Sequence, residues 1–456
     1  MPGRASVSDG VGGETPNGAA MIARMHGRLN SFQRTMLQWN DMHPYNAVHV
    51  ARIPEALDPE RLRNVLIGTL ETQGLARLTL NRDKGTYQYL GGSASGEVKM
   101  VATEGGADLA LSAETERQLN AGFFPDGEFN PFRFWVAPER EAFFLGLAYF
   151  HAIADAESVV LLIKDVVNAY LGRSGRGLSS PVDRHPPCLD NLLPSHPGTL
   201  ARKLLALPSL IRDLRSSCRV RCREPQNFHN GCVFFSLKPE PMRALVEAGK
   251  AWEVTLNDLF LALVMKSLFP LASGRMRGKR RRRMSVGCIV NLRRDLGVDS
   301  QRTFGLFLGS FIVTHEAPEE ISLMNLARDL HRQTLRIKRN RLYLGTPLEL
   351  GFARFMFSLF STERRWKFYQ KHYPLWGGIT NMNLNSLWDQ QAGERPVDYF
   401  RAVSTGPAIP LVLSVTTVRD HLNVGLTYRS AVFSAPEIEQ VKHSFLESLN
   451  HLKGQR

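Results

Sequence analysis

The stretch that decides the fold is Phe143-Phe144-Leu145-Gly146-Leu147-Ala148-Tyr149-Phe150-His151-Ala152-Ile153-Ala154-Asp155-Ala156-Glu157-Ser158. An apolar, aromatic-rich run of strand length stops at His151, Asp155 follows four residues later, and apolar residues then recur with helical spacing from Val159. A histidine at the end of a buried strand can have one ring nitrogen fixed by a local hydrogen bond while the other faces a cleft. The stretch therefore predicts a strand, a turn that carries a general base, and a helix.

Length and composition indicate a globular protein with an acidic partner. The chain has 456 residues, which is room for two or three domains, and its 43% hydrophobic content is enough for large buried cores. The net charge of +14 suits a phosphate-bearing cofactor, an acidic carrier protein, an anionic membrane or nucleic acid. Charge alone does not choose among these partners.

Cysteine usage and the N-terminal residues bear on the compartment. Met1–Ala20 is polar and has no apolar core segment, so we expect neither a secretory signal nor a membrane anchor and assign the protein to the cytoplasm. An odd number of cysteines then argues for reduced thiols. Cys218, Cys222, His229 and Cys232 loosely suggest a zinc site, but the first spacing is not the usual one. We favour incidental thiols and expect no metal.

Changes in composition divide the chain into four parts. Residues 1–28 read as a disordered leader, 29–173 as an N-terminal lobe, 174–200 as a Pro-rich linker and 201–456 as a C-terminal lobe. Helices are predicted at 31–39, 59–72, 112–121, 158–171, 239–249, 255–271, 318–338, 348–371 and 435–452. Strands are predicted at 47–53, 76–80, 86–90, 98–101, 132–136, 142–150, 231–237, 285–290, 378–384, 400–403, 411–418 and 422–428, and residues 305–313 form an apolar segment broken by glycine.

Two basic stretches allow a functional and a structural interpretation. Residues 201–215 form a basic amphipathic segment interrupted by Pro208, and a helix packed on a neighbouring lobe is favoured over a membrane contact. The most charged patch connects a predicted helix to a predicted strand and includes Arg277, Lys279, Arg280 and Arg281. Such a loop is usually solvated, although it would also suit phosphates or an acidic protein. It lacks interleaved aromatic residues, which argues against nucleic acid.

The order of these segments resembles the condensation-domain and chloramphenicol-acetyltransferase-like superfamily of acyl-thioester-dependent acyltransferases, from Leu29 onward. Phe150–Ala156 matches the His-His-x-x-x-Asp-Gly motif in position and context. Further similarity lies in Gln33–Ala47, in Thr255–Asp258 with Val290–Arg293, and in Pro407–Phe445. The motif departs from the family at its first histidine, here Phe150, and at its closing glycine, here Ala156. The Asp-Phe-Gly-Trp-Gly signature of the plant BAHD branch is absent, so we expect a standalone bacterial-type member.

The resemblance implies an α/β (α+β) fold of two lobes, each a mixed, largely antiparallel sheet with flanking helices, and an active-site tunnel between them. It implies that His151 is the general base and that no covalent acyl-enzyme forms. Asp155 would be structural and paired with Arg293. Asn381 would donate to the oxyanion, although a strand-bridging amide is the competing interpretation.

The resemblance also implies the partners. We expect no tightly bound cofactor and an acyl-CoA or a phosphopantetheine-linked acyl donor as co-substrate, with a hydroxyl or amine of a small molecule or lipid as acceptor. A monomer is expected. Two alternatives stay open: a non-catalytic relative that docks an acidic acyl-carrier protein through the basic patch, and a peripheral membrane transferase acting on a lipid alcohol.

Overall fold

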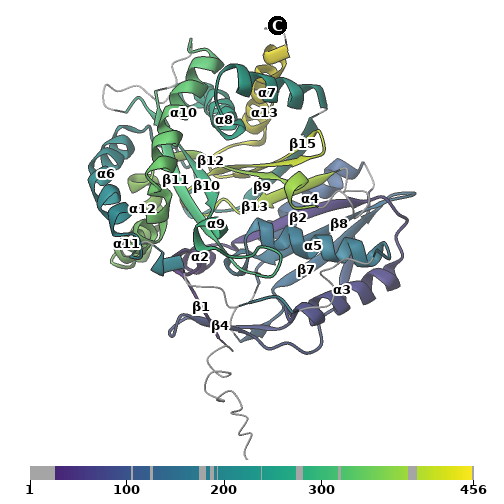
Figure 1. Cartoon of the computed structure of the whole chain (residues 1–456). Coiled ribbons are helices and arrows are strands. Elements are labelled where there is room, and N and C mark those ends of the chain that lie inside the picture. Colours follow the sequence, from purple (N-terminus) through teal and green to yellow (C-terminus); the bar gives the residue numbers. More distant parts are fainter. Residues whose placement is uncertain are drawn as a thin grey trace, which may run out of the picture.

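A computed structural model describes residues 26–453, apart from 104–105, 124–126, 174–180, 185–188, 193, 238, 274–280, 317–319 and 389–397. Most of the predicted leader and part of the predicted linker lie outside the described residues, as do Arg277, Lys279 and Arg280. The described chain forms two sheet-based lobes that face one another (Figure 1). The mixed α/β class predicted from the sequence is confirmed.

The first lobe is built on a five-stranded sheet with the order β13-β2-β8-β7-β5, antiparallel except between β5 and β7. Its strands are β2 (Asn46–Ile53), β5 (Val98–Met100), β7 (Phe132–Pro138), β8 (Phe143–Phe150) and β13 (Tyr399–Val403). The accompanying helices are α3 (Pro59–Gln73), α4 (Ala107–Asn120) and α5 (Ala156–Tyr170). A small sheet lies beside it and contains β1 (Gly27–Arg28), β3 (Leu78–Asn81), β4 (Thr86–Tyr89) and β6 (Glu128–Phe129).

The second lobe is built on a six-stranded sheet with the order β11-β10-β12-β14-β15-β9. Its strands are β9 (Asn230–Leu237), β10 (Met284–Asn291), β11 (Leu308–His315), β12 (Leu375–Asn383), β14 (Leu411–Val418) and β15 (His421–Arg429). Its helices are α7 (Pro239–Ala251), α8 (Leu256–Ser273), α10 (Leu323–Arg339) and α13 (Ala435–Lys453). These helices lie on the side of the sheet away from the first lobe (Figure 1).

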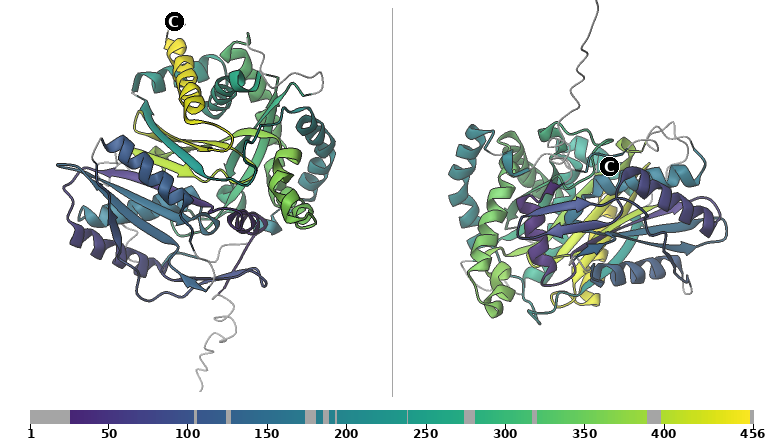
Figure 2. Two further views of the ribbon diagram at one scale, coloured as in Figure 1. Left: turned by 180° about the vertical axis from the view of Figure 1, so that it is seen from behind. Right: turned by 90° about the horizontal axis from the view of Figure 1, so that it is seen from below.

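The lobes are not separate along the chain, because β13 comes from the later part of the sequence and completes the first sheet. It pairs antiparallel with β2, from Tyr399 opposite Ala51 to Val403 opposite Ala47. Figure 2 shows the purple and blue elements of the first lobe below the green and yellow elements of the second when the molecule is seen from behind. The boundary between the lobes at residues 174–200 remains a prediction, and β13 is a strand from beyond that boundary that returns to the first lobe.

The remaining helices lie partly at one side of the molecule and partly between the lobes, and some of their bounds differ from those expected (Figure 1). They are α2 (Ser31–Asn40), α6 (Pro197–Ser216), α9 (Arg293–Leu296), α11 (Thr346–Ser358) and α12 (Thr362–His372). The helical region predicted at 348–371 consists of two helices, α11 and α12, and Ser361 occupies the N-cap position of α12. The interruption predicted at Pro208 is wrong, since α6 continues through that proline.

Strand β8 positions the site because it is a fully buried central strand. All of Phe143–Phe150 is buried, which is why the run is apolar on both faces. Gly146 is required in the middle, where a Cβ would come within 1.9 Å of Cε2 of Trp135. At Phe150 the chain leaves the sheet as a single 3-10 turn, His151–Ile153, and α5 begins at Ala156 with Asp155 as its N-cap.

Candidate active site

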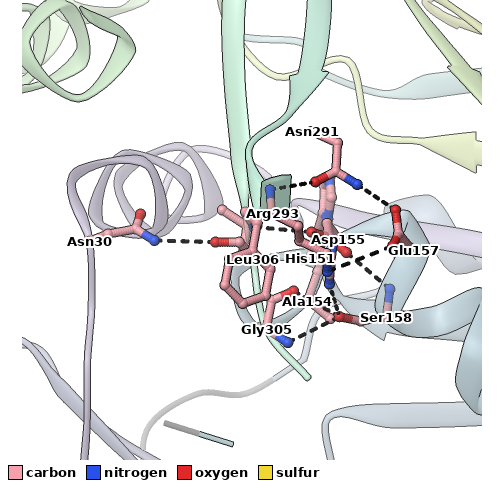
Figure 3. Close-up of polar contacts among 11 residues, drawn as sticks. Asn30, His151, Ala154, Asp155, Glu157, Ser158, Asn291, Arg293, Gly305 and Leu306 are labelled. Atoms are coloured by element: carbon pink, nitrogen blue, oxygen red, sulfur yellow. Dashed lines mark hydrogen bonds and ion pairs between the residues drawn. The ribbon is translucent and has the colours of Figure 1, made fainter. Parts of the chain in front are cut away.

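His151 is held at the end of β8 with its tautomer defined. Its Nδ1 donates to the carbonyl oxygen of Ala154 at 3.0 Å (Figure 3). Because a carbonyl only accepts, Nδ1 carries the proton and the lone pair of the neutral ring lies on Nε2. Tyr45 stacks on the imidazole and Tyr149 meets it edge-on, each with its ring centroid 5.7 Å away. The ring is therefore fixed in an orientation suited to accepting a proton.

Burial controls the charge of this imidazole. His151 is 7% exposed, and this burial lowers its pKa from the ordinary value to about 4, with the Ala154 carbonyl and the charge of Asp155 opposing the shift. At neutral pH the ring is therefore uncharged, which is the form that a general base requires.

Asp155 and Arg293 form a buried ion pair between the lobes. Nη1 of Arg293 lies 2.6 Å from Oδ2 of Asp155, and both side chains are buried. The same Oδ2 accepts from the backbone N–H of Phe307 at 3.0 Å, and Oδ1 accepts from the N–H of Ser158 at 3.0 Å. Three hydrogen bonds thus hold the carboxylate, and the structure contains the ion pair that the resemblance implies.

A second set of contacts extends this network around the turn. Nη2 of Arg293 donates to Oγ of Ser158 at 2.7 Å, and that hydroxyl donates to the carbonyl oxygen of Gly305 and accepts from its N–H, both at 3.0 Å. Nε of Arg293 lies 3.9 Å from Oε1 of Glu157, and Oε2 of Glu157 accepts from the side-chain amide of Asn291 (Figure 3). The turn that carries His151 is therefore fastened to the second lobe at several points.

A cavity of about 180 Å³ lies between the lobes and includes His151 in its wall. Its lining is mostly apolar and comes from both sheets and from α2 and α11. The first lobe contributes residues such as Met36, Tyr45 and Tyr149, and the second contributes residues such as Ile289 and Ile379. An apolar cavity with a few polar groups is the usual form of a small-molecule site.

Several polar residues that line the cavity were not predicted from the sequence. His49 on β2, Tyr149 on β8 and Arg401 on β13 are buried and line the cavity with His151. The hydroxyl of Tyr149 has no hydrogen-bond partner among the described residues. The available signal was a polar residue inside a short apolar strand, as in Asn46–Ile53 and Tyr399–Val403.

The two departures from the family motif leave the reactive geometry intact. Phe150 points to the other side of β8 from His151 and packs edge-on against Phe123 and Phe129, with centroid distances of 6.1 and 5.6 Å. It belongs to the core and not to the cavity lining. Ala156 is the first residue of α5 and lines the cavity beside His151.

The structure does not bring Asn381 to His151. Asn381 is exposed on β12 and is not part of the cavity wall, whereas its neighbour Thr380 is. Successive strand residues face opposite sides, so a difference of one position moves a side chain from the cavity to the surface. Among the residues of the basic patch, Arg281 is described and donates from Nη1 to the carbonyl oxygen of Ser217 at 2.9 Å.

The cysteine-rich segment is divided among different elements. Cys232 lies in β9 and is buried, and burial raises the pKa of its thiol. Cys218 follows α6 and is also buried, while Cys222 is half-buried. Within the residues that the structure describes, no three His, Cys, Asp or Glu side chains lie close enough together to hold a metal ion.

Comparison with known proteins gives a match in structure only. No protein-family model and no curated protein sequence matches the chain. The EpoB NRPS cyclization-docking bidomain from Sorangium cellulosum superposes with a TM-score of 0.66 at 11% identity, covering 94% of this chain and 85% of that chain. The first condensation domain of the calcium-dependent antibiotic synthetase gives a TM-score of 0.66 at 15% identity, covering 94% and 97%.

A third solved structure agrees with these two. The condensation domain of the Monacolin K polyketide synthase MokA superposes with a TM-score of 0.61 at 13% identity, covering 94% of this chain and 98% of that chain. At such identities a likeness establishes the fold. The chain has the two-lobed, chloramphenicol-acetyltransferase-like fold of the condensation domains, in agreement with the superfamily that its sequence resembles.

Proposed function

We propose that this protein is an acyltransferase that moves an acyl group from a phosphopantetheine thioester to a hydroxyl or amine, with His151 as general base. The observation that carries the proposal is the position of His151, whose Nδ1 is held by Ala154 in the wall of an apolar cavity between the lobes. The fold shared with condensation domains supports the same reaction class. The donor would be acyl-CoA or an acyl-carrier protein.

In this mechanism Nε2 of His151 accepts the proton of the acceptor as its oxygen or nitrogen attacks the thioester carbonyl carbon. The tetrahedral intermediate then expels the thiolate, which takes the proton back from the imidazolium. No bond forms between the acyl group and the protein. Positioned base catalysis of this kind contributes about 10²–10⁴-fold, and holding both substrates together contributes much of the rest.

The developing oxyanion needs a hydrogen-bond donor, and Tyr149 fits this role better than Asn381. Burial raises the pKa of its phenol, which therefore keeps its proton, and the hydroxyl has no partner among the described residues. Its ring lies edge-on to His151. A donor held in place before the reaction needs no reorganisation as charge develops.

Thiol release from acyl-CoA tests the proposal. Wild-type protein is incubated with acyl-CoAs of increasing chain length and a mixture of hydroxyl and amine acceptors. His151→Ala is compared with His443→Gln, an exposed histidine on α13 that serves as the matched control. We expect acceptor-dependent thiol release that is lost in His151→Ala and kept in His443→Gln, with unchanged circular dichroism. Release that persists in His151→Ala overturns the proposal.

The same experiment separates the non-catalytic alternative. A protein that only docks an acidic carrier would release no thiol with any donor, yet would bind that carrier. Reversing the charge of Arg277, Lys279, Arg280 and Arg281 should then abolish carrier binding. If the reversed variant also loses transfer from a carrier but not from CoA, the patch docks the donor of an active enzyme.

A peripheral membrane transferase is the second candidate, and one surface favours it. Leu348, Phe352, Phe355 and Leu359 recur on one face of α11 and are 43–64% exposed. Leu205 is 81% exposed. It belongs to α6, which lies beside α11 (Figure 1). Exposed apolar stripes of this kind are typical of membrane or protein contacts.

This face lies directly behind the cavity wall. Leu350 and Ala353 of the same helix line the cavity, so a lipid acceptor could pass from a bilayer to His151 around α11. No single helix in the described chain is long and apolar enough to cross a membrane, although the bent pair α7 and α8 passes that test together. Flotation with phosphatidylglycerol-containing vesicles tests the idea. Wild-type protein should float with the vesicles, and the double variant Phe352→Ser with Phe355→Ser should not. If the wild-type protein does not float either, the membrane candidate is removed.

A further inference from the structure

Arg401 is a buried cation in the wall of a cavity whose lining is mostly apolar. Its side chain is 3% exposed and lies on β13, directly opposite His49 of β2. Among the described residues, no carboxylate forms an ion pair with it. An unpaired charge taken out of water costs several kcal/mol, so such a residue is rare unless something compensates it.

Hydrogen bonds hold the guanidinium in one orientation without neutralising it. Nε donates to Oγ1 of Thr416 at 2.9 Å, and Nη2 donates to the carbonyl oxygens of Val415 at 2.6 Å and Thr380 at 3.2 Å. Nη1 makes one long contact of 3.4 Å with Oγ1 of Thr380. Since a guanidinium has five N–H donors, two of them on Nη1, at least one stays available for a ligand.

The neighbouring titratable groups leave the charge uncompensated. Burial raises the pKa of the Tyr149 and Tyr399 phenols, which therefore stay neutral. Burial and the charge of Arg401 lower the pKa of His49, which therefore stays neutral as well. Glu349, which also lines the cavity, is paired with Lys203 at 2.5 Å, so its charge is balanced there. Arg401 therefore gives the cavity an unpaired positive charge, and the lining also offers apolar residues such as Val412.

We propose that Arg401 binds a carboxylate of the acceptor, so that the cavity selects an acceptor with a carboxylate at one end and an apolar body. A carboxylate matches the guanidinium in charge and planar shape, whereas a phosphate dianion would bring a second charge that no group on this wall offsets. Strands β13 and β8 are two strand spacings apart, and Tyr149 is in register with Val403, two residues further along β13 than Arg401, so the backbone positions of Arg401 and Tyr149 are about 12 Å apart.

The placement gives the acceptor a defined length. When the carboxylate of the acceptor binds Arg401, the hydroxyl or amine of the same molecule would reach His151 only if an apolar spacer of several carbons separates the two groups. The role of His151 in this statement rests on the function proposed above. The recognition of a carboxylate by Arg401 does not, because it concerns binding alone and can be measured without any turnover.

Calorimetric titration with octanoate and octanamide tests the inference. The two probes have nearly the same shape and differ in charge, and inorganic phosphate serves as a third probe for a phosphate ligand. We expect octanoate to bind wild-type protein at least about tenfold more tightly than octanamide, which corresponds to about 1.4 kcal/mol. Phosphate should bind more weakly than octanoate. Equal binding of octanoate and octanamide, or binding of neither at millimolar concentration, overturns the inference.

Variants separate recognition from a structural role. Arg401→Gln should bring the two affinities together, while Arg401→Lys should keep part of the preference because it keeps the charge. Arg429→Gln is the matched control: Arg429 is 1% exposed, donates to the carbonyl of Gly406 and lies outside this cavity. It should keep the full preference for octanoate. A preference that survives in Arg401→Gln means that Arg401 only joins the sheets, and overturns the inference.

Discussion

His151 and His49 are both buried in the cavity wall, yet they are held in different ways at two ends of one site. His151 sits on a turn, donates to a backbone carbonyl and has Asp155 nearby. His49 sits in the middle of β2, its Nδ1 lies 2.8 Å from the hydroxyl of Tyr399, and Arg401 faces it across the strand pair. The nearest charge is thus negative for one ring and positive for the other.

The sign of the neighbouring charge determines which of the two histidines can accept a proton. An imidazolium at position 151 would be stabilised by the Ala154 carbonyl and by Asp155 as it forms. An imidazolium at position 49 would form beside the cation of Arg401. Two buried histidines in one cavity are therefore suited to opposite tasks: His151 to proton transfer, and His49 to supporting the end where an anion binds.

Replacing each of the two histidines should have the largest effect on catalysis. His151→Gln is expected to lower kcat by about 10²–10⁴-fold, because the proton acceptor is lost. His49→Gln should mainly raise the KM for the acceptor, with a loss in kcat at least tenfold smaller. Steady-state thiol release with varied acceptor measures both. Equal losses in kcat would mean that the two ends do not have separate tasks.

Removing the charge of Asp155 should cost stability at the His151 end. Asp155→Asn leaves Arg293 buried without a counter-ion, and we expect the free energy of unfolding to fall by about 3–5 kcal/mol. The exposed pair Lys442 and Glu439 on α13 provides the control, since Glu439→Gln should cost less than about 1 kcal/mol. Urea denaturation measures both variants. Similar costs would show that the buried pair does not hold the turn.

The two tyrosines should respond in opposite directions. Tyr149→Phe removes a buried hydroxyl without a partner, so stability should stay the same or rise by about 1 kcal/mol. Its kcat should fall by about 10²-fold if the phenol donates to the oxyanion. Tyr399→Phe removes the hydroxyl that contacts His49 and should lower stability by about 1 kcal/mol. A Tyr149→Phe enzyme with normal kcat would exclude the donor role.

The pH dependence should give the smallest effect. Because burial lowers the pKa of His151 to about 4, kcat/KM is expected to stay level from pH 8 to about 5 and to fall only below that. Below about pH 6.5, the ordinary pKa of the imidazole, the unfolded ring gains a proton that the buried ring does not yet bind. The native state therefore loses stability as the pH falls toward 4. An acid limb of kcat/KM centred near pH 6.5 would contradict the neutral, buried ring.

The turn and its ion pair were predictable because their signals are local or shared with a family pattern. An apolar strand that ends in His151, with Asp155 as the N-cap of the next helix, is visible in sequence. Arg293 follows a second apolar strand, and the resemblance supplied its partner. The helical region at 348–371 is visible in sequence because its residues are helix-compatible on both sides of Ser361, whereas the break between α11 and α12 is seen only in the structure.

The other end of the cavity was not predictable, because it exists only after distant strands meet. Arg401 reaches His49 through the pairing of β13 with β2, and no periodicity within either strand announces that pairing. Asn381 was placed one position away from the cavity-lining residue, Thr380, since sequence does not show which face of β12 is turned inward. Sequence signals identify a reactive side chain more readily than the residues that surround its substrate.

Strand β13 is synthesised long after the strands of the sheet that it completes. During synthesis, β13 leaves the ribosome roughly 250 residues after β8, which takes about 10–50 s at 5–20 residues per second. Throughout that interval the edge of β2 has no partner strand, and unpaired apolar edges recruit other chains. The nascent first lobe is thus a natural client for a chaperone. Aggregation of this protein would be expected to begin on the polysomes that translate it.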